Sequence, residues 1–386
     1  MVVAYYTSAN FIDSFIEVIQ GIKEKVTLHV FIEISNHSKN ATFINVDSID
    51  EMEFIESPER ILGKQQWELF KPYFEGVSSV HFIVQKNKKT FSLKSLSNAI
   101  KLGKYIKKLK IDVFHFDTIL PRAIGLYPFI KNKQIVVTEH DPIAHSGEES
   151  WKKQLPRLIF HKKTNAFVFY SKFAESQFIG HYKNNNAPTF VVPFQPFSFI
   201  KNYFQQQNNE GNTILFFGRL SYYKGIDILL NAIPLVLEKY PEEKFVIAGK
   251  PSFGYEVDNN VINKFPNNFK VITSFLNNND LVKLIEESKF VICPYRDATQ
   301  SGVLMTAFAA KKMVIATNVG SFPEFIINDV NGLLSMPDSK SLAEKIILAL
   351  DNGYYKTIQN NVKSQSTDEN NIEIANQLLL AYQPIK

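Results

Sequence analysis

The chain has a single cysteine, Cys293, among its 386 residues. One cysteine excludes an internal disulfide, and a chain without disulfides suits a reducing compartment. Cys293 follows three apolar residues and has no histidine near it in the sequence, which favours a buried thiol at a strand end over a catalytic nucleophile. Apolar runs are also short, and none approaches the roughly eighteen residues that a membrane-spanning helix needs.

Several other sequence features are missing. Residues 1–6 carry neither a basic stretch nor a small-residue cleavage site, so they predict a strand and not a secretion signal. No Gly-x-Gly-x-x-Gly occurs, which argues against a nicotinamide enzyme. Zinc-finger spacings and basic segments interleaved with aromatic residues are lacking too, so nucleic acid is not an expected partner. With 45% apolar and 21% charged residues, we expect a globular, cytoplasmic protein.

Acidic residues are missing from Lys86–Lys110, which holds nine lysines. Leu96, Ile100, Gly103 and Ile106 recur there at helical spacing, so the segment predicts an amphipathic helix with a lysine-rich outer face. That face is either simply solvated or rests on an anionic membrane surface, at the cytoplasmic side. No apolar wedge is evident, which favours surface association over insertion.

Short apolar runs alternate with amphipathic stretches along the whole chain. Strands are predicted at 2–6, 28–32, 79–84, 113–116, 135–138, 166–169, 189–192, 213–217, 244–248, 269–273, 290–293 and 313–316. Helices are predicted between them, for example at 226–239, 279–287, 302–310 and 339–350. This alternation predicts an α/β protein with parallel sheets covered by helices.

A polar stretch at 205–212 interrupts the pattern and marks the expected domain boundary. We predict an N-terminal domain at 1–204, a C-terminal domain at 205–370, and a last helix at 371–386 that packs back on the N-terminal domain. The two domains should be Rossmann-like and face each other across a cleft.

The first candidate site is a loop framed by Gly218 and Gly225. It follows the strand at 213–217 and carries Arg219 and Lys224. Loops at the carboxyl ends of parallel strands are where α/β folds bind ligands. Two cations at this spacing suit a diphosphate, since Arg binds phosphate oxygens bidentately and Lys supplies a point charge. The alternative is two solvated basic residues on a turn.

Two more loops follow strands of the same half. After the strand at 290–293, Ser301 and Gly302 should begin a helix whose N–H groups and dipole favour an anion, unless Ser301 is an ordinary helix cap. After the strand at 313–316, Gly320 and Pro323 mark a tight loop. Glu324 stands in the first turn of the helix that follows, where a carboxylate usually just complements the helix dipole. Three such loops on one sheet edge favour a phosphate site.

Residues 213–350 resemble the donor domain of retaining glycosyltransferases of family four, which have the GT-B fold. The matching stretches are Phe217–Leu220, Lys224–Ala232, Phe245–Gly249, Val314–Gly320 with Pro323-Glu324, and Asn331–Leu334. The resemblance implies that Arg219 and Lys224 bind the donor diphosphate. It also implies a donor site lined by Gly218, Asp297, Thr299, Gln300, Ser301, Gly302, Val303, Thr306 and Glu324.

One departure from the family pattern concerns acidic residues. Members usually carry two glutamates, eight residues apart, that contact the donor sugar and the ribose. The positions that match them here are Ala298 and Thr306, with Asp297 one place away. Either Asp297, Gln300, Ser301 and Thr306 take over in a family variant, which we favour, or activity is lost.

The N-terminal half resembles the acceptor domain more weakly. His140 follows the strand at 135–138, where the family often has a histidine, and could bond or polarise a sugar hydroxyl. Asp141, His145 and Ser171 are further acceptor-side candidates. Thr7–Asn10 replaces the usual glycine pair, which puts phosphate contacts there in doubt.

The sequence therefore predicts a GT-B transferase. It would move a sugar from a nucleotide diphosphate sugar to a glycan or lipid-linked hydroxyl acceptor. The resemblance implies retention of anomeric configuration and a role in polysaccharide biosynthesis. We expect no metal or other cofactor, because neither an Asp-x-Asp nor a His/Cys set follows a strand. A catalytically silent subunit that binds a partner protein, and a sugar-nucleotide epimerase, remain alternatives.

Overall fold

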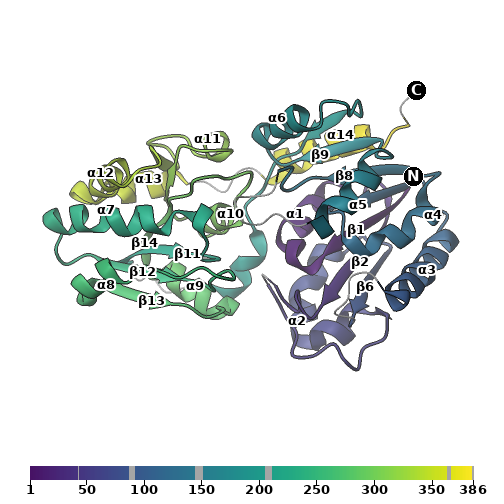
Figure 1. The fold of residues 1–386 in the computed structure, drawn as a ribbon, viewed down its shortest axis with the longest axis horizontal. Helices are drawn as coiled ribbons and strands as arrows, with labels where there is room; N and C mark the ends of the chain where they lie inside the picture. Colours follow the sequence, from purple (N-terminus) through teal and green to yellow (C-terminus); the bar gives the residue numbers. More distant parts are fainter. Residues whose placement is uncertain (42, 87–91, 144–150, 205–210, 363–366, 385–386) are drawn as a thin grey trace. The chain divides into compact units, whose positions relative to one another are not determined.

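A computed structural model describes residues 1–41, 43–86, 92–143, 151–204, 211–362 and 367–384. The chain forms two compact units (Figure 1). The first comprises Met1–Ile143, Glu149–Gln195 and Ser366–Lys386, and the second comprises Pro196–Gln365. The units thus divide at Pro196, earlier than the predicted boundary. Most of the polar stretch behind that prediction, residues 205–210, lies outside the described residues.

The first unit is built on a sheet with the strand order β10-β9-β8-β7-β1-β2-β6-β5. Its strands are β1 (Val2–Ser8), β2 (Thr27–Ser35), β5 (Ile55–Glu56), β6 (Ser79–Gln85), β7 (Val113–Phe116), β8 (Gln134–Thr138), β9 (Ala166–Phe169) and β10 (Thr189–Val191). Its helices are α1 (Ile12–Ile22), α2 (Pro58–Phe74), α3 (Leu93–Lys108), α4 (Tyr127–Ile130), α5 (Trp151–His161), α6 (Lys172–His181) and α14 (Thr367–Ala381). The strands pair in parallel except for β5, which runs antiparallel to β6.

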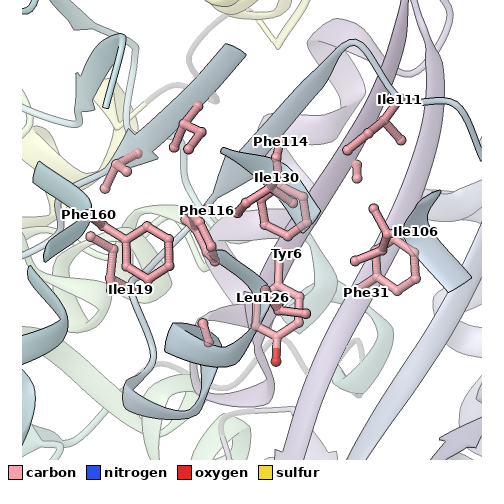
Figure 2. Close-up of a cluster of buried hydrophobic side chains, with 14 of the residues drawn as sticks. Tyr6, Phe31, Ile106, Ile111, Phe114, Phe116, Ile119, Leu126, Ile130 and Phe160 are labelled. Carbon is pink, nitrogen blue, oxygen red and sulfur yellow. The ribbon is translucent and has the colours of Figure 1, made fainter. Parts of the chain in front are cut away.

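The long strands of this unit are apolar runs that are buried on both faces, as parallel strands between helical layers must be. On one face of the sheet, aromatic and branched side chains form a core cluster (Figure 2). Tyr6 from β1, Phe114 and Phe116 from β7, and Ile106 from α3 are nearly inaccessible within it. The cluster packs the helices against this face of the sheet and so holds in place the strands from which the loops at the sheet edge begin.

Helix α3 corrects the predicted amphipathic face. Gly103 and Ile106 are buried as expected, but Leu96 and Ile100 are 50% and 38% exposed. Close packing decides which side faces inward: a Cβ on Gly103 would lie 2.2 Å from the Phe129 ring, so this face of the helix lies against α4. The exposed face is therefore both lysine-rich and apolar, which the spacing alone did not predict.

Helix α14 joins the first unit, although it follows the second unit in the sequence. It packs on α1 and lies beside β9 and β10 (Figure 1). Gly21 of α1 allows the close approach, because a Cβ there would lie 2.8 Å from the Asn371 carbonyl oxygen. Just beyond the helix, the buried Tyr382 hydroxyl lies 2.8 Å from His115 Nδ1 of β7.

The second unit has a parallel sheet with the order β13-β12-β11-β14-β15-β16. Its strands are β11 (Thr213–Phe217), β12 (Lys244–Ala248), β13 (Phe269–Ile272), β14 (Ser288–Cys293), β15 (Val314–Thr317) and β16 (Gly332–Ser335). Its helices are α7 (Ile226–Lys239), α8 (Asn260–Lys264), α9 (Asn278–Glu286), α10 (Gly302–Ala309), α11 (Phe322–Phe325), α12 (Ser339–Leu350) and α13 (Tyr354–Asn361). Helices α7 and α12 pack together over this sheet (Figure 1).

Every strand predicted from the sequence is present, with ends shifted by a few residues. Strands β5 and β16, and the small hairpin of β3 (Asn40–Ala41) and β4 (Ile44–Asn45), are additional. Strands of two residues are too short to show the alternation by which strands are recognised.

Cys293 ends β14 and is fully buried, as predicted, and burial raises the pKa of its thiol to about 12. No helix in the described part of the chain combines the length and hydrophobicity needed to cross a membrane.

Candidate functional site

Both sheets have a point at which the strand order reverses direction. In the second unit it lies between β11 and β14, and in the first it lies between β1 and β7. Chain crossovers leave in opposite directions there, so the loops at the carboxyl ends of the two strands separate and leave room for a ligand. In the second unit, two of the candidate loops follow β11 and β14, and in the first unit His140 follows β8, the neighbour of β7 in the sheet.

In the second unit, the loop after β11 and the loop after β14 touch through their backbones. Gly225 has a φ of 65°, and a Cβ at this position would lie only 1.9 Å from the Pro294 carbonyl oxygen. Close by, the Arg296 N–H donates to the Tyr223 carbonyl at 2.8 Å. A residue with a side chain could not replace Gly225 without separating the two loops.

The loop after β15 is joined to the same cluster. Gly320 has a φ of 56°, and a Cβ there would lie 1.9 Å from the Ala298 carbonyl oxygen, which also accepts a 2.8 Å hydrogen bond from the Ser321 N–H. Gly218 lies against the first turn of α10, since a Cβ there would be 3.0 Å from Val303 Cγ2. The structure thus brings together all three loops that the sequence singled out.

The two predicted cations of this edge differ in their surroundings. Arg219 is exposed, whereas Lys224 is buried. The Lys224 ammonium lies 3.7 Å from the centre of the Tyr295 ring and 5.0 Å from that of Tyr223. An ammonium over an aromatic face is held by the ring's negative potential. Lys224 is therefore a positioned charge, and Arg219 is an accessible one.

Helix α10 begins at Gly302, and Ser301 is its N-cap: the Ser301 Oγ accepts from the Leu304 N–H at 3.3 Å. This corrects the prediction that Ser301 is the first helical residue, and it shows that the ordinary capping interpretation holds for its side chain. The first turn of α10 contains no acidic residue. Its N-terminal N–H groups and dipole still favour an anion.

The other predicted donor-site residues lie on the same three segments. Thr299 and Thr306 are buried, and so is Ala298, which occupies one of the two positions where the family has glutamate. Asp297, Gln300 and Val303 are half-buried, and Glu324 is exposed in α11.

In the first unit, His140 follows β8 and is almost fully buried. Its Nε2 lies 3.3 Å from Oδ1 of Asp117, which directly follows β7. The other carboxylate oxygen of Asp117 accepts from the Thr7 hydroxyl at 2.6 Å, and the Tyr170 hydroxyl lies 3.5 Å from Oδ1. The imidazole stacks on Phe11 with 4.0 Å between the ring centres. Four strand ends thus contribute to one buried polar cluster.

Electrostatics in this cluster favour a protonated histidine. Burial by itself lowers the pKa of His140, but the charge and hydrogen bond of Asp117, with Asp141 and Asp13 nearby, raise the pKa overall. For Asp13, in the first turn of α1, burial outweighs the favourable contacts of the charged form. Burial and the negative charge of Asp117 raise the pKa of Asp13 to about 7, against the Ser14 N–H bond and His140.

Two other acceptor-side candidates have been placed. Asp141 is half-buried beside His140. The Ser171 Oγ caps α6 by accepting from the Ala174 N–H at 3.1 Å, a structural role. His145 lies outside the described residues. Within the described part of the chain, no three His, Cys, Asp or Glu side chains form a group that could hold a metal ion.

Sequence reasoning missed three acidic residues: Asp117 and Asp13 of the cluster around His140, and Asp227, which pairs with Arg296 of the loop after β14. Asp117 directly follows a predicted strand, so the rule that selected His140 would also have selected it. Asp13 and Asp227 both stand in first helical turns, where acidic residues are common. Nothing in their sequence context distinguished them from ordinary dipole-favouring charges.

Two family models match this chain on separate segments. The model described as Glycosyl transferases group 1 matches residues 211–352, and the model described as Glycosyltransferase Family 4 matches residues 67–193. The first match contains all three loops of the second unit, and the second contains Asp117 and His140.

Similar proteins have been found in archaea and among solved structures. An uncharacterized glycosyltransferase of Methanocaldococcus jannaschii is 33% identical over 153 residues, which are 39% of this chain and 39% of the relative. A second one from that organism is 25% identical over 69% of this chain and 73% of its own length. The crystal structure of Anabaena HepE in complex with UDP-glucose has a TM-score of 0.67 at 16% identity, covering 98% of this chain and 100% of that one. At this identity the likeness concerns the fold, which is GT-B.

Asp117 should control the protonation of His140. We expect His140 to titrate above the usual histidine pKa of about 6.5, and Asp117→Asn to lower its pKa by removing the stabilising charge. The tighter proton binding of the folded state stabilises the protein below about pH 6.5, and this contribution is lost as the pH rises through the folded pKa. Histidine NMR titration, with signals assigned through His140→Gln, measures both pKa values.

His81 is an internal control for that titration. Burial lowers its pKa, and its Nε2 lies 2.8 Å from the Tyr105 hydroxyl. The pKa of His81 should therefore be the same in both proteins. Equal His140 pKa values in the two proteins would contradict the assigned pairing.

Proposed function

Because two glycosyltransferase family models match this chain, over residues 67–193 and 211–352, we propose that it transfers a sugar from a nucleotide diphosphate sugar to a hydroxyl acceptor, with retention of anomeric configuration. One observation carries the proposal: the loop with Arg219 and Lys224 and the N-terminus of α10 converge at the reversal point of the second sheet. A buried positive charge, an exposed one and a helix dipole would then act on one anion.

The chemistry would consist mainly of charge stabilisation and positioning. As the bond between the anomeric carbon and the donor phosphate oxygen breaks, negative charge grows on the departing diphosphate. Arg219, Lys224 and the first turn of α10 would stabilise this charge. Lys224 would do so without reorganising, because it is already held against Tyr295. Asp297, Gln300, Ser301 and Thr306 would hold the sugar and the ribose in place of the usual glutamates.

The acceptor would bind at the carboxyl edge of the first sheet, beside His140. The raised pKa of His140 favours its protonated form, in which the ring donates hydrogen bonds and is a poor general base. We therefore assign His140 the role of a charged donor to a substrate oxygen. The acceptor class, a glycan or lipid-linked sugar of polysaccharide biosynthesis, follows from the resemblance.

Removing either phosphate-binding cation should slow the reaction strongly. We expect Arg219→Ala and Lys224→Met each to lower kcat/KM by more than tenfold, since one lost charge contact to a developing diphosphate costs roughly 2–4 kcal/mol. Turnover of a nucleotide-sugar panel that starts with UDP sugars measures this, and thermal melting checks the fold. Lys270→Ala is the control, because Lys270 is an exposed lysine of the same sheet on β13.

Three outcomes of this assay would count against the proposal. Near-wild-type kcat/KM in both variants would show that the diphosphate lies elsewhere. Neither transfer nor hydrolysis by the wild-type protein would indicate a silent subunit. Conversion of the free nucleotide sugar to its epimer would indicate an epimerase.

The reaction should need no divalent metal, since Arg219 and Lys224 supply the positive charge that a cation otherwise gives to a diphosphate. Activity is therefore expected to be unchanged by a chelator such as EDTA. Loss of turnover on chelation, with rescue by Mg²⁺ or Mn²⁺, would contradict this. A chelator with excess Ca²⁺ controls for effects of EDTA itself.

Helix α3 suits docking on an anionic membrane. Its exposed face combines Leu93, 87% exposed, and Leu96 with lysines that include Lys101 and Lys104. Each lysine near such a surface contributes about 1 kcal/mol, and the attraction is screened within roughly 8 Å at physiological salt. The exposed leucines add an apolar contact that the sequence did not predict.

Vesicle co-sedimentation tests this docking. We expect binding to vesicles with anionic lipid, weaker binding at high salt, and weaker binding of the Lys101→Gln/Lys104→Gln variant, whereas Lys270→Gln should bind like the wild type. Equal binding to neutral and anionic vesicles, or no binding to either, would leave a solvated helix face.

A further inference from the structure

At the reversal point of the second sheet, an ion pair joins the loop after β14 to the start of α7. Arg296 lies in the loop after β14, and Asp227 lies in the first turn of α7. Arg296 Nη1 donates to Asp227 Oδ1 at 2.7 Å, and its Nη2 donates to Oδ2 at 2.5 Å. Both oxygens of the carboxylate are engaged by a planar fork, which fixes direction as well as distance.

The other contacts of Arg296 return to the loop that carries Arg219 and Lys224. Nη1 also donates to the Tyr222 carbonyl at 3.0 Å, and the guanidinium lies 4.3 Å from the centre of the Tyr222 ring. The Arg296 backbone N–H donates to the Tyr223 carbonyl at 2.8 Å. One residue thus holds both neighbours that precede Lys224.

The Asp227 carboxylate also affects where an anion can bind at this edge of the sheet. The hydrogen bond from Arg296 lowers the pKa of Asp227, and the N–H groups of Asp227 and Ile228 lower it further, so the carboxylate is ionised. It neutralises Arg296 and faces the N–H groups of its own helix. An anion is therefore disfavoured at the start of α7, whereas the first turn of α10 has no acidic residue.

We propose that Asp227 and Arg296 are positioning residues for the donor diphosphate: the pair locks the 219–224 loop and leaves the α10 N-terminus as the anion site. This inference rests on the proposed function. The side chains of Asp227 and Arg296 are 46% and 27% exposed, and ion pairs at such exposure add little to global stability. Their loss should therefore affect loop order and ligand affinity more than unfolding.

The test uses Asp227→Asn, Arg296→Ala and the double variant of the full chain. UDP and GDP are the probes for calorimetric binding, donor kinetics separate KM from kcat, and hydrogen exchange reports on residues 219–224 without ligand. We expect each single variant to weaken binding of the probe that the wild type accepts by about tenfold or more. KM should rise more than kcat falls, and loop exchange should become faster.

The double variant should bind the probe no more weakly than the single variant with the lower affinity, because the effects of substitutions in one interacting pair are not additive. Arg296→Lys, which keeps the charge but loses the fork, should fall between the wild type and Arg296→Ala. The control is Lys239→Ala, which breaks the Lys239–Asp351 ion pair at the other end of α7. It should leave affinity and loop exchange unchanged.

The inference and the proposed function fail in different ways. Unchanged affinity and loop exchange in Asp227→Asn, in a wild-type background that binds the probe, would overturn the inference alone. So would a fall in melting temperature that accounts for the whole loss of binding. A wild-type protein that neither binds UDP or GDP nor transfers sugar would overturn both, whatever the loop exchange shows.

Discussion

Gly225 packs against the Pro294 carbonyl oxygen, and Gly320 packs against the Ala298 carbonyl oxygen, both closer than any residue with a side chain could come. These two contacts set the spacing of the three loops at the edge of the second sheet. Because a Cβ at either glycine would lie 1.9 Å from a carbonyl oxygen, any side chain there would force the loops apart. The placement of Lys224, the direction of α10 and the Arg296 contacts all depend on this packing.

The two units organise charge in opposite ways. At the edge of the second sheet, the Lys224 ammonium is held by aromatic rings, and the Asp227 carboxylate is occupied by Arg296 and by its own helix. At the edge of the first sheet, Asp117 is wholly buried and is satisfied by hydroxyl groups and by His140. The first arrangement suits a doubly charged leaving group, and the second suits a histidine that keeps its proton.

Such a division of roles fits a reaction in which the protein contributes position and charge. In the proposed reaction, Lys224 would not need to move to meet the diphosphate, because aromatic rings hold its ammonium, and preorganised charge stabilises a transition state most effectively. His140 is likewise fixed by stacking on Phe11 and by Asp117.

The sequence by itself determined the α/β class, the positions of the long strands and the identity of the three loops, because strand periodicity, glycine and charge are local signals. It also led to His140, which stands just after a strand. Only the tertiary structure decided that Asp117 pairs with His140, that Arg296 reaches Asp227, and that Leu96 and Ile100 face outward. These outcomes depend on which segments meet after folding, and a linear pattern does not record distances between residues far apart in the chain.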